Sequence, residues 1–209
     1  MNFRVDGHSD DTLVVFAHGA GAGMDSDFMS QFAKQLALHS IRVLRFNFGY
    51  MQANAEDGKR RPPERMPKLL DHFEDVLQHA IHEYKPKRLF LMGKSMGGRV
   101  ATILCANTKH TVNGVMCLGY PFIPIKGGNP RLEPLELCPV PVCLIQGERD
   151  RFGNREQVGQ WQLPDTIKMC WISDGDHSLQ PRKMSGHTLE KNLQNAVSEC
   201  IKFIGGIHA

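Results

Sequence analysis

The hydrophobic and polar positions of this chain follow two periods that alternate from one end to the other. Short, continuously apolar runs have the pattern of strands that are covered on both faces. Longer stretches repeat their apolar positions at helical spacing. Strands are predicted at 12–17, 41–46, 88–92, 112–118, 140–145 and 167–172. Helices are predicted from Asp25 or Ser26 to about residue 39, and at 66–84, 96–107 and 189–204, the last one ended by Gly205 and Gly206.

Strands that alternate with helices predict an α/β protein with a mostly parallel central sheet and helices on both faces. No repeat or linker interrupts the pattern, so we expect one domain that spans 1–209. Ligands of such sheets bind beyond the carboxyl ends of the strands. The two longest connections, 47–63 and 120–139, both follow strands and are predicted to overhang a site at that edge.

Composition narrows the class of protein. The chain has 209 residues, of which 41% are hydrophobic and 22% charged, as is typical of a soluble globular domain with a sizeable core. A formal net charge of +3 is too small to indicate nucleic-acid binding, and the densest basic run covers only residues 59–61. We therefore expect no nucleic-acid partner.

The chain shows no sign of membrane association or export. The first six residues lack the apolar run of a signal peptide, and no stretch reaches the roughly 18 apolar residues of a membrane span. The six cysteines form no Cys-x-x-Cys pair and fall in apolar runs, so we interpret them as reduced core residues. Their spacing offers no metal site. These features predict a cytoplasmic protein.

One motif carries the chemistry. The residues Gly93-Lys94-Ser95-Met96-Gly97 lie between a predicted buried strand and a predicted helix. This is Gly-x-Ser-x-Gly in the strand-turn-helix context of a nucleophile elbow, in which the glycines give room for a sharp turn. Ser95 is the predicted nucleophile. The competing interpretation is a plain tight turn.

A nucleophilic serine also needs groups that stabilise an oxyanion. The N–H group of Met96, at the start of the helix, is one predicted donor. The glycine-rich segment 18–23 follows the first predicted strand, and the N–H group of Ala20 is the other. A phosphate-binding loop would need Lys-Ser/Thr after Gly23, which is absent, and the dinucleotide fingerprint does not match in register. His18 is interpreted as a structural residue of this loop.

A serine hydroxyl requires a base, and in this architecture the order along the chain is serine, acid, histidine. His177 combines that order with a loop directly after the last predicted strand, so it is the predicted base. Asp150 is the predicted acid, because the turn begun at Gly147 must return over the end of the sheet. Glu148 is the alternative acid. Asp176 is interpreted as a loop or capping residue.

These residues resemble the α/β-hydrolase superfamily along nearly the whole chain, and more narrowly a small branch without a cap that is related to dienelactone hydrolases. That branch includes bacterial hydrolase-like proteins, the testis-expressed hydrolase-like protein and a domain in a subunit of a histone acetyltransferase complex. The resemblance implies the triad Ser95, Asp150 and His177, and it implies that some animal members act as complex subunits. It rests on His18-Gly19-Ala20-Gly21, Arg45-Phe46-Asn47-Phe48, Tyr50-Met51, Lys59-Arg60-Arg61-Pro62-Pro63 and Gly93-Lys94-Ser95-Met96-Gly97-Gly98-Arg99.

The sequence departs from the family pattern at two positions. Dienelactone hydrolases use a cysteine nucleophile where this chain has Ser95, so their substrate is not carried over. Lys94 replaces the histidine, tyrosine or glutamate that often precedes the nucleophile. One interpretation is that Lys94 raises the local positive potential; the favoured one is that it points into solvent or pairs with an acid.

We therefore expect a serine hydrolase that cleaves a small carboxylic ester or thioester, without a cofactor or metal. The alternative is a protein-interaction module on the same fold, with weak or no catalysis. Arg60 and Arg61 lie in the connection 47–63, which is expected to follow the strand beside the nucleophile strand. They are candidates for binding an anionic group of the substrate or of a protein partner, and the competing interpretation is a solvated loop.

Overall fold

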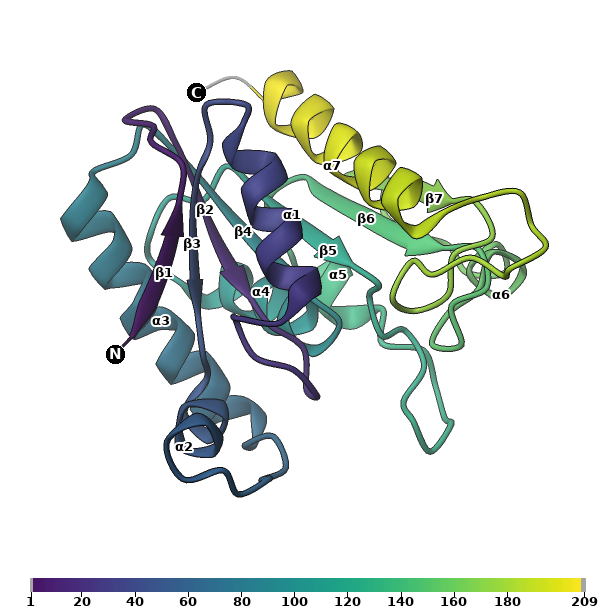
Figure 1. The fold of residues 1–209 in the computed structure, drawn as a ribbon, viewed down its shortest axis with the longest axis horizontal. Helices are drawn as coiled ribbons and strands as arrows, with labels where there is room; N and C mark the ends of the chain where they lie inside the picture. The colour runs from purple at the N-terminus through teal and green to yellow at the C-terminus, as the bar shows by residue number, and fades with distance from the viewer. Residues whose placement is uncertain (1, 208–209) are drawn as a thin grey trace.

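A computed structural model describes residues 2–207 as a seven-stranded sheet with the strand order β1-β3-β2-β4-β5-β6-β7 (Figure 1). All neighbouring strands are parallel except β1 and β3, which are antiparallel. The strands are β1 Phe3–Asp6, β2 Thr12–Ala17, β3 Arg42–Phe46, β4 Arg88–Lys94, β5 Gly114–Leu118, β6 Val142–Gly147 and β7 Ile167–Ile172. The helices are α1 Asp27–Ala37, α2 Gly49–Asp57, α3 Met66–Tyr84, α4 Met96–Asn107, α5 Glu133–Glu136, α6 Arg155–Val158 and α7 Leu189–Gly206.

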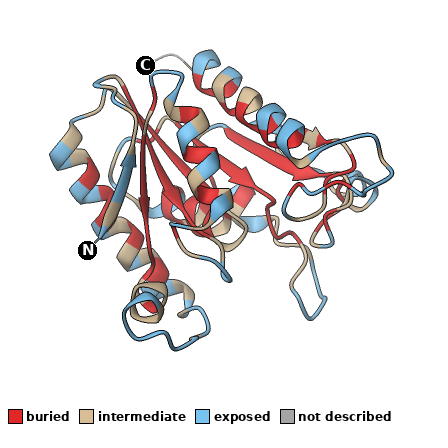
Figure 2. Ribbon diagram, in the orientation of Figure 1, coloured by how far each residue is buried: buried red, intermediate tan, exposed pale blue. Residues whose placement is uncertain are grey.

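The sheet is covered on both faces, as the apolar runs predict. Successive side chains of a strand point to opposite faces. In β2, Val14 and Phe16 join the apolar cluster that packs against α1 and α7, whereas Leu13 and Val15 join the cluster that packs against α3 and α4. Figure 2 shows the central strands buried, the edge strand β1 largely exposed and the helices exposed on their outer sides. The α/β fold with a mostly parallel sheet is therefore confirmed.

Four short elements escape the sequence prediction. The edge strand β1 has only four residues and two exposed positions, so it carries no apolar run. The helix α2 lies inside the connection 47–63, which the sequence analysis treats as a loop, and α5 lies inside 120–139. The four-residue helix α6 follows β6. Short helices without a long apolar stripe are stabilised by tertiary packing, which local patterns do not reveal.

The predicted end of the last helix and the predicted place of one strand in the sheet also need correction. The helix α7 continues through Gly205 and Gly206 instead of ending before them. The connection 47–63 follows β3, which lies beside β2 and not beside β4, the strand that leads to Ser95. Among residues 2–207, no helix is long and apolar enough to cross a membrane.

Candidate active site

Ser95 lies at the sharp turn between β4 and α4, with φ 52° and ψ −116°. A left-handed backbone is unusual for a residue with a side chain and is characteristic of strained functional turns. The turn needs glycines around it. A Cβ atom on Gly93 would lie 2.1 Å from the backbone of Gly97, and one on Gly97 would lie 2.6 Å from the carbonyl oxygen of Ala17. The nucleophile-elbow geometry predicted for this motif is therefore present.

The structure brings Ser95 together with the two partners that the sequence analysis selects. His177 Nε2 lies 2.9 Å from Ser95 Oγ, and His177 Nδ1 lies 2.8 Å from Asp150 Oδ2. Both distances are those of hydrogen bonds. Asp150 stands in the turn after β6, and His177 in the loop between β7 and α7. The carboxyl ends of β4, β6 and β7 thus place the three side chains in one chain of hydrogen bonds.

Asp150 is fully buried, and its carboxylate is held by further donors. Gln146 donates from Nε2 to Asp150 Oδ2 at 3.0 Å, and the backbone N–H of Phe152 donates to Oδ1 at 2.9 Å. Hydrogen bonds of this kind offset the cost of burying a charge. Gln146 is a residue that sequence reasoning misses, because at the end of an apolar strand it has no signal beyond its polarity.

The surroundings of His177 favour its neutral form. Burial lowers the pKa of the imidazole below its ordinary value of 6.5, and the positive charge of Lys94 lowers the pKa further, whereas the hydrogen bond to Asp150 opposes the shift. The ring of Phe152 packs edge-on against the imidazole at 4.5 Å between centroids. A neutral imidazole whose Nδ1 faces a carboxylate can accept a proton at Nε2.

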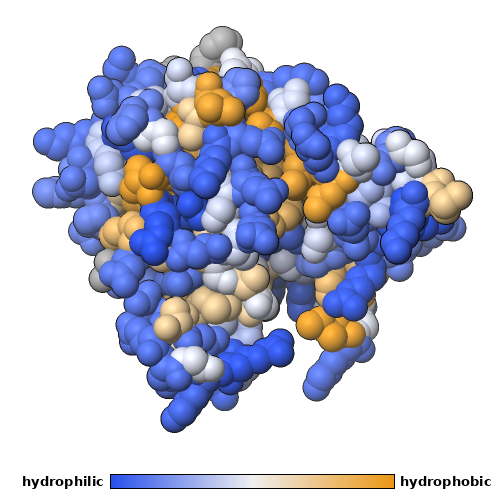
Figure 3. All heavy atoms as spheres, in the orientation of Figure 1, coloured by the Kyte–Doolittle hydropathy of each residue, from blue (hydrophilic) through white to orange (hydrophobic). Residues whose placement is uncertain are grey.

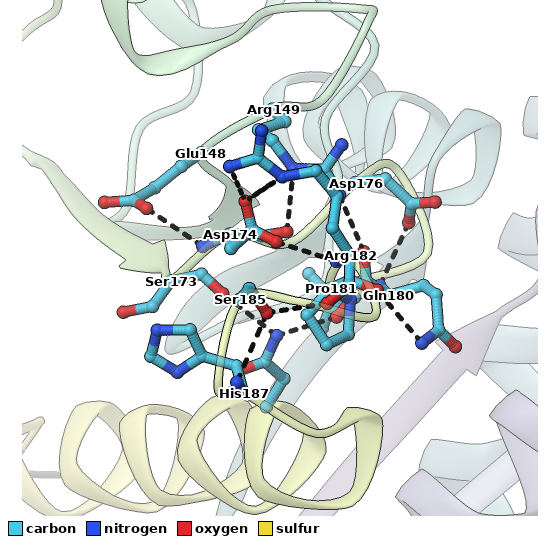
Figure 4. A network of polar contacts seen from close by, with 12 residues as sticks. Glu148, Arg149, Ser173, Asp174, Asp176, Gln180, Pro181, Arg182, Ser185 and His187 are labelled. Atoms are coloured by element: carbon cyan, nitrogen blue, oxygen red, sulfur yellow. Dashed lines mark hydrogen bonds and ion pairs between the residues drawn. The ribbon is translucent and has the colours of Figure 1, made fainter.

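Asp174 anchors the loop that carries His177 through contacts with two arginine side chains (Figure 4). Arg149 Nε lies 2.9 Å from Asp174 Oδ1, and Arg182 Nε donates to the same oxygen at 2.8 Å. These arginines hold the pKa of the Asp174 carboxyl at about 2. Arg149 comes from the turn after β6, so the ion pair joins the segment of Asp150 to the segment of His177.

Two further carboxylates have structural contacts in this loop. Glu148, the alternative acid, accepts the backbone N–H of Asp174 at 2.9 Å (Figure 4). It also pairs with Arg155 at 2.7 Å, and the carboxylate on His177 is that of Asp150 instead. Asp176 accepts the backbone N–H groups of Ser178 and Gln180. Its interpretation as a loop-capping residue is confirmed.

Lys94 contradicts its expectation, because it neither points into solvent nor forms an ion pair with a carboxylate of residues 2–207. Its half-buried Nζ donates a hydrogen bond to the carbonyl oxygen of His177 at 2.6 Å. Burial lowers the pKa of this ammonium to about 8. The residue before the nucleophile therefore holds the backbone of the histidine loop.

Ala20 and Met96 line the same cavity as Ser95, which has a volume of about 390 Å³. In the described part of the chain, no protein group accepts a hydrogen bond from the backbone N–H of either residue. Figure 3 shows the surface hollowed at this edge of the sheet, between the α2 segment and the connection after β5. Both N–H groups are therefore free to bind an oxygen atom in the cavity.

His18 shapes the loop that carries Ala20. The fully buried ring accepts the backbone N–H of Phe48 at Nε2, so Nδ1 carries the proton and donates it to the carbonyl oxygen of Gly19. Burial lowers the pKa of His18 to about 4. The hydroxyl of Tyr50, on α2, lies 3.2 Å from the carbonyl oxygens of Gly19 and Ala20. His18 is thus a structural residue, as expected.

Arg60 and Arg61 do not line the Ser95 cavity. They border a neighbouring hollow of about 410 Å³, which shares Ala20 with it. The guanidinium of Arg61 is 2.6 Å from Asp57 Oδ2, so its charge is already paired on α2. Arg60 is exposed. Both arginines therefore lie outside the Ser95 cavity, beside the hollow that adjoins it.

The remaining site predictions concern cysteines and metals. All six cysteines are buried and free, as expected. Within residues 2–207, no group of three or more histidine, cysteine, aspartate or glutamate side chains is arranged to hold a metal ion.

Comparisons with known proteins agree with this architecture. A family model described as alpha/beta hydrolase domain matches residues 10–205. A dienelactone hydrolase from Anabaena variabilis is 18% identical, with a TM-score of 0.71 over 96% of this chain and 90% of that chain. A Xanthomonas campestris protein, described as a serine hydrolase of this fold without a lid, is 16% identical, with a TM-score of 0.70 over 99% and 89%. The protein Est1E from Butyrivibrio proteoclasticus, with ferulic acid bound, is 14% identical, with a TM-score of 0.71 over 98% of this chain and 95% of that chain.

At these identities the solved structures show the fold, and the family match extends over nearly the whole chain. The described residues include no separate cap domain, like the Xanthomonas protein without a lid. The match supports a hydrolase activity. The chain belongs to the family of alpha/beta hydrolase domains.

Proposed function

We propose that this protein is a serine hydrolase that cleaves a carboxylic ester or thioester through Ser95, His177 and Asp150. The observation that carries the proposal is the continuous chain of hydrogen bonds from Asp150 through His177 to a serine on a strained turn. A merely structural serine gains nothing from a positive φ and an aligned imidazole. Such strain is instead characteristic of functional sites.

The reaction follows from the positions of the groups. Ser95 Oγ attacks the carbonyl carbon and forms a bond to it while its proton passes to His177 Nε2. The N–H groups of Ala20 and Met96 stabilise the oxyanion. The bond to the alcohol or thiol then breaks, and the leaving group takes the proton from His177. A water molecule then gives a proton to the same imidazole and attacks the carbonyl carbon of the acyl-enzyme. The bond to Ser95 Oγ breaks, the carboxylic acid is released, and His177 returns the proton to Ser95.

Asp150 has the third role in the proposal. Its carboxylate accepts the Nδ1 proton of His177 and so selects the tautomer whose Nε2 can act as a base. It also stabilises the imidazolium that forms during the attack. This chemistry requires no cofactor. The described residues contain no cap domain over the cavity, which suits a small substrate or the end of a larger one.

The role of Arg60 and Arg61 stays a hypothesis within this proposal. If they bind an anionic group of the substrate, replacing both with alanine will slow turnover of acidic esters more than turnover of neutral ones. An equal effect on both esters would favour the competing interpretation, a solvated loop. The ion pair of Arg61 with Asp57 also favours that interpretation. The narrower relation to the testis-expressed and histone acetyltransferase subunit group, the cytoplasmic location and a protein partner also remain predictions.

The proposal is tested by labelling with a fluorophosphonate, which reacts with activated serines. We expect a single adduct on Ser95, located by mass spectrometry, that is lost in Ser95→Ala and reduced at least about a hundredfold in rate in His177→Ala. Ser198→Ala, on α7 away from the site, is the matched control. Absence of labelling in a folded wild-type protein would reject the serine hydrolase and favour the protein-interaction module, with a partner pull-down as the next step.

A further inference from the structure

The cavity in front of Ser95 is lined by three positively charged side chains and, among its described lining residues, by no carboxylate. The cations are Arg99, Lys126 and Arg131. Its apolar wall is formed by Met96, Pro121, Pro124, Ile125 and Phe152. Like charges gathered around one hollow repel each other unless an anion lies between them. This arrangement distinguishes the cavity from a pocket for a wholly neutral substrate.

Of these three cations, Arg99 is the nearest to the nucleophile along the chain. It lies four residues after Ser95, and its backbone N–H donates to the carbonyl oxygen of Ser95. Residues four apart share one face of a helix, with Cβ atoms about 5–6 Å apart. The guanidinium therefore projects on the same side of α4 as the nucleophile, one turn further along.

The guanidinium of Arg99 has no protein partner within residues 2–207. Its Nε is buried and makes no hydrogen bond, and the side chain forms no ion pair with any described carboxylate. A buried donor without an acceptor is costly and calls for a physical explanation. A substrate group that accepts from this guanidinium supplies one.

Arg131 is held in place from the other side of the cavity. Its Nη1 donates to the carbonyl oxygen of Pro121 at 3.2 Å, its backbone N–H donates to Phe122, and its carbonyl oxygen accepts the hydroxyl of Tyr120. These bonds close the connection 120–131 on itself (Figure 1). Arg99 and Arg131 line the same cavity, and burial together with the charge of Arg99 lowers the pKa of Arg131.

We propose that this cavity binds a phosphate group carried by the substrate, with Arg99 and Arg131 as its two guanidinium donors and Lys126 as a flanking cation. The inference deepens the proposed function, on which it rests, by naming the substrate class: a phosphorylated ester or thioester. A dianion compensates three cations better than a single carboxylate does. Its tetrahedral oxygens can accept from guanidiniums on two sides, which planar forks suit. The apolar wall contacts the chain between phosphate and carbonyl.

Binding is measured on Ser95→Ala, so that the result does not depend on turnover. The probes are phenyl phosphate and benzoate, which share the ring and differ in the anion, and inorganic phosphate, all titrated by calorimetry at low ionic strength. We expect phenyl phosphate to bind at least about tenfold more tightly than benzoate, and Arg99→Gln and Arg131→Gln each to weaken it about tenfold or more. Lys109→Gln, which removes an exposed cation outside the cavity, should leave the affinity unchanged.

Each outcome supports or overturns the proposal. Equal binding of phenyl phosphate and benzoate would overturn the choice of phosphate, and an affinity insensitive to Arg99→Gln would overturn the site. If Arg99→Gln unfolds, Arg131→Gln and Lys126→Gln carry the same test, and an affinity that neither of them changes overturns the site as well. If Ser95 is labelled by the fluorophosphonate but the protein binds no phosphate, the phosphate subsite is rejected and the serine hydrolase is retained. Phosphate binding without labelling would keep an anion site and reject the hydrolase.

Discussion

Lys94 Nζ donates a hydrogen bond to the backbone carbonyl oxygen of His177 at 2.6 Å, and so joins the residue before the nucleophile to the residue that faces it. The contact fixes the histidine loop over the end of β4. It also places a positive charge beside the imidazole, which lowers the pKa of His177. Lys94 is therefore a positioning residue with both a geometric and an electrostatic effect.

Replacement of Lys94 by methionine should change the pH profile as well as the rate. Loss of the charge raises the pKa of His177, so the acidic limb of the kcat/KM profile should move to higher pH. We expect kcat/KM at the plateau to fall about tenfold from misplacement of the base. Lys94→Arg retains the charge and should retain the position of the limb. A slower enzyme with an unmoved limb would show that Lys94 acts through geometry alone.

The two carboxylates after β6 should differ sharply on substitution. Asp150→Asn removes the acceptor that selects the His177 tautomer, and we expect kcat to fall by roughly 10⁴ with the fold retained. Glu148→Gln leaves the hydrogen bond between Asp150 and His177 intact, so kcat should stay within about tenfold of the wild-type value. The unfolding temperature should fall, because the ion pair with Arg155 is lost. Steady-state kinetics with a small aryl ester measures both. The reverse ranking would make Glu148 the acid.

His18 should make the stability of the fold depend on pH between about 4 and 6.5. Its folded-state pKa is lowered to about 4, so below 6.5 the unfolded chain binds a proton that the folded chain excludes. Stability is therefore fully present above 6.5, decreases as pH falls, and levels off for this group below about 4. The shift corresponds to a free energy of unfolding on the order of 3 kcal/mol.

Urea unfolding at a series of pH values measures this dependence. His18→Asn should be less stable at pH 7 and should show a flatter slope between pH 4 and 6.5. The pKa of the Asp174 carboxyl is lowered from 3.8 to about 2, so its contribution to stability is lost only as the pH falls below about 3.8. That pH range lies below the range in which His18 acts. An unchanged slope in His18→Asn would assign the dependence to other groups.

Gly97→Ala should be strongly destabilising. An added Cβ would meet the carbonyl oxygens of Ala17 and His18 at 2.6 Å, and both belong to backbone that cannot move without disturbing β2. We expect a loss of about 1–3 kcal/mol in the free energy of unfolding, together with weaker labelling of Ser95. Gly205→Ala is the matched control, because its Cβ would meet nothing within 4 Å on α7. That variant should be neutral or more stable by about 0.4–1 kcal/mol.

Elements whose signals are local could be predicted from the amino-acid pattern alone. A strand buried on both faces must be apolar almost throughout, so the predicted run 12–17 coincides with the fully buried β2. The run 167–172 coincides with the partly exposed edge strand β7. The start of α4 is predictable because a sharp turn between strand and helix demands glycines at set distances from Ser95. Asp150 and His177 could be selected because each follows a strand, and the carboxyl ends of parallel strands lie at one edge. Their adjacency is thus implied by chain order.

Contacts between side chains of distant segments depend on how the whole chain packs. Lys94 and His177 are 83 residues apart, and no local pattern encodes a lysine reaching a carbonyl oxygen. The expectation that β3 neighbours β4 is wrong because the order of strands depends on long-range pairing. For the same reason Arg60 and Arg61, the predicted anion contacts, border a neighbouring hollow, whereas Arg99 and Arg131 line the Ser95 cavity. The course of a connection, and so what its side chains face, depends on packing against the whole fold.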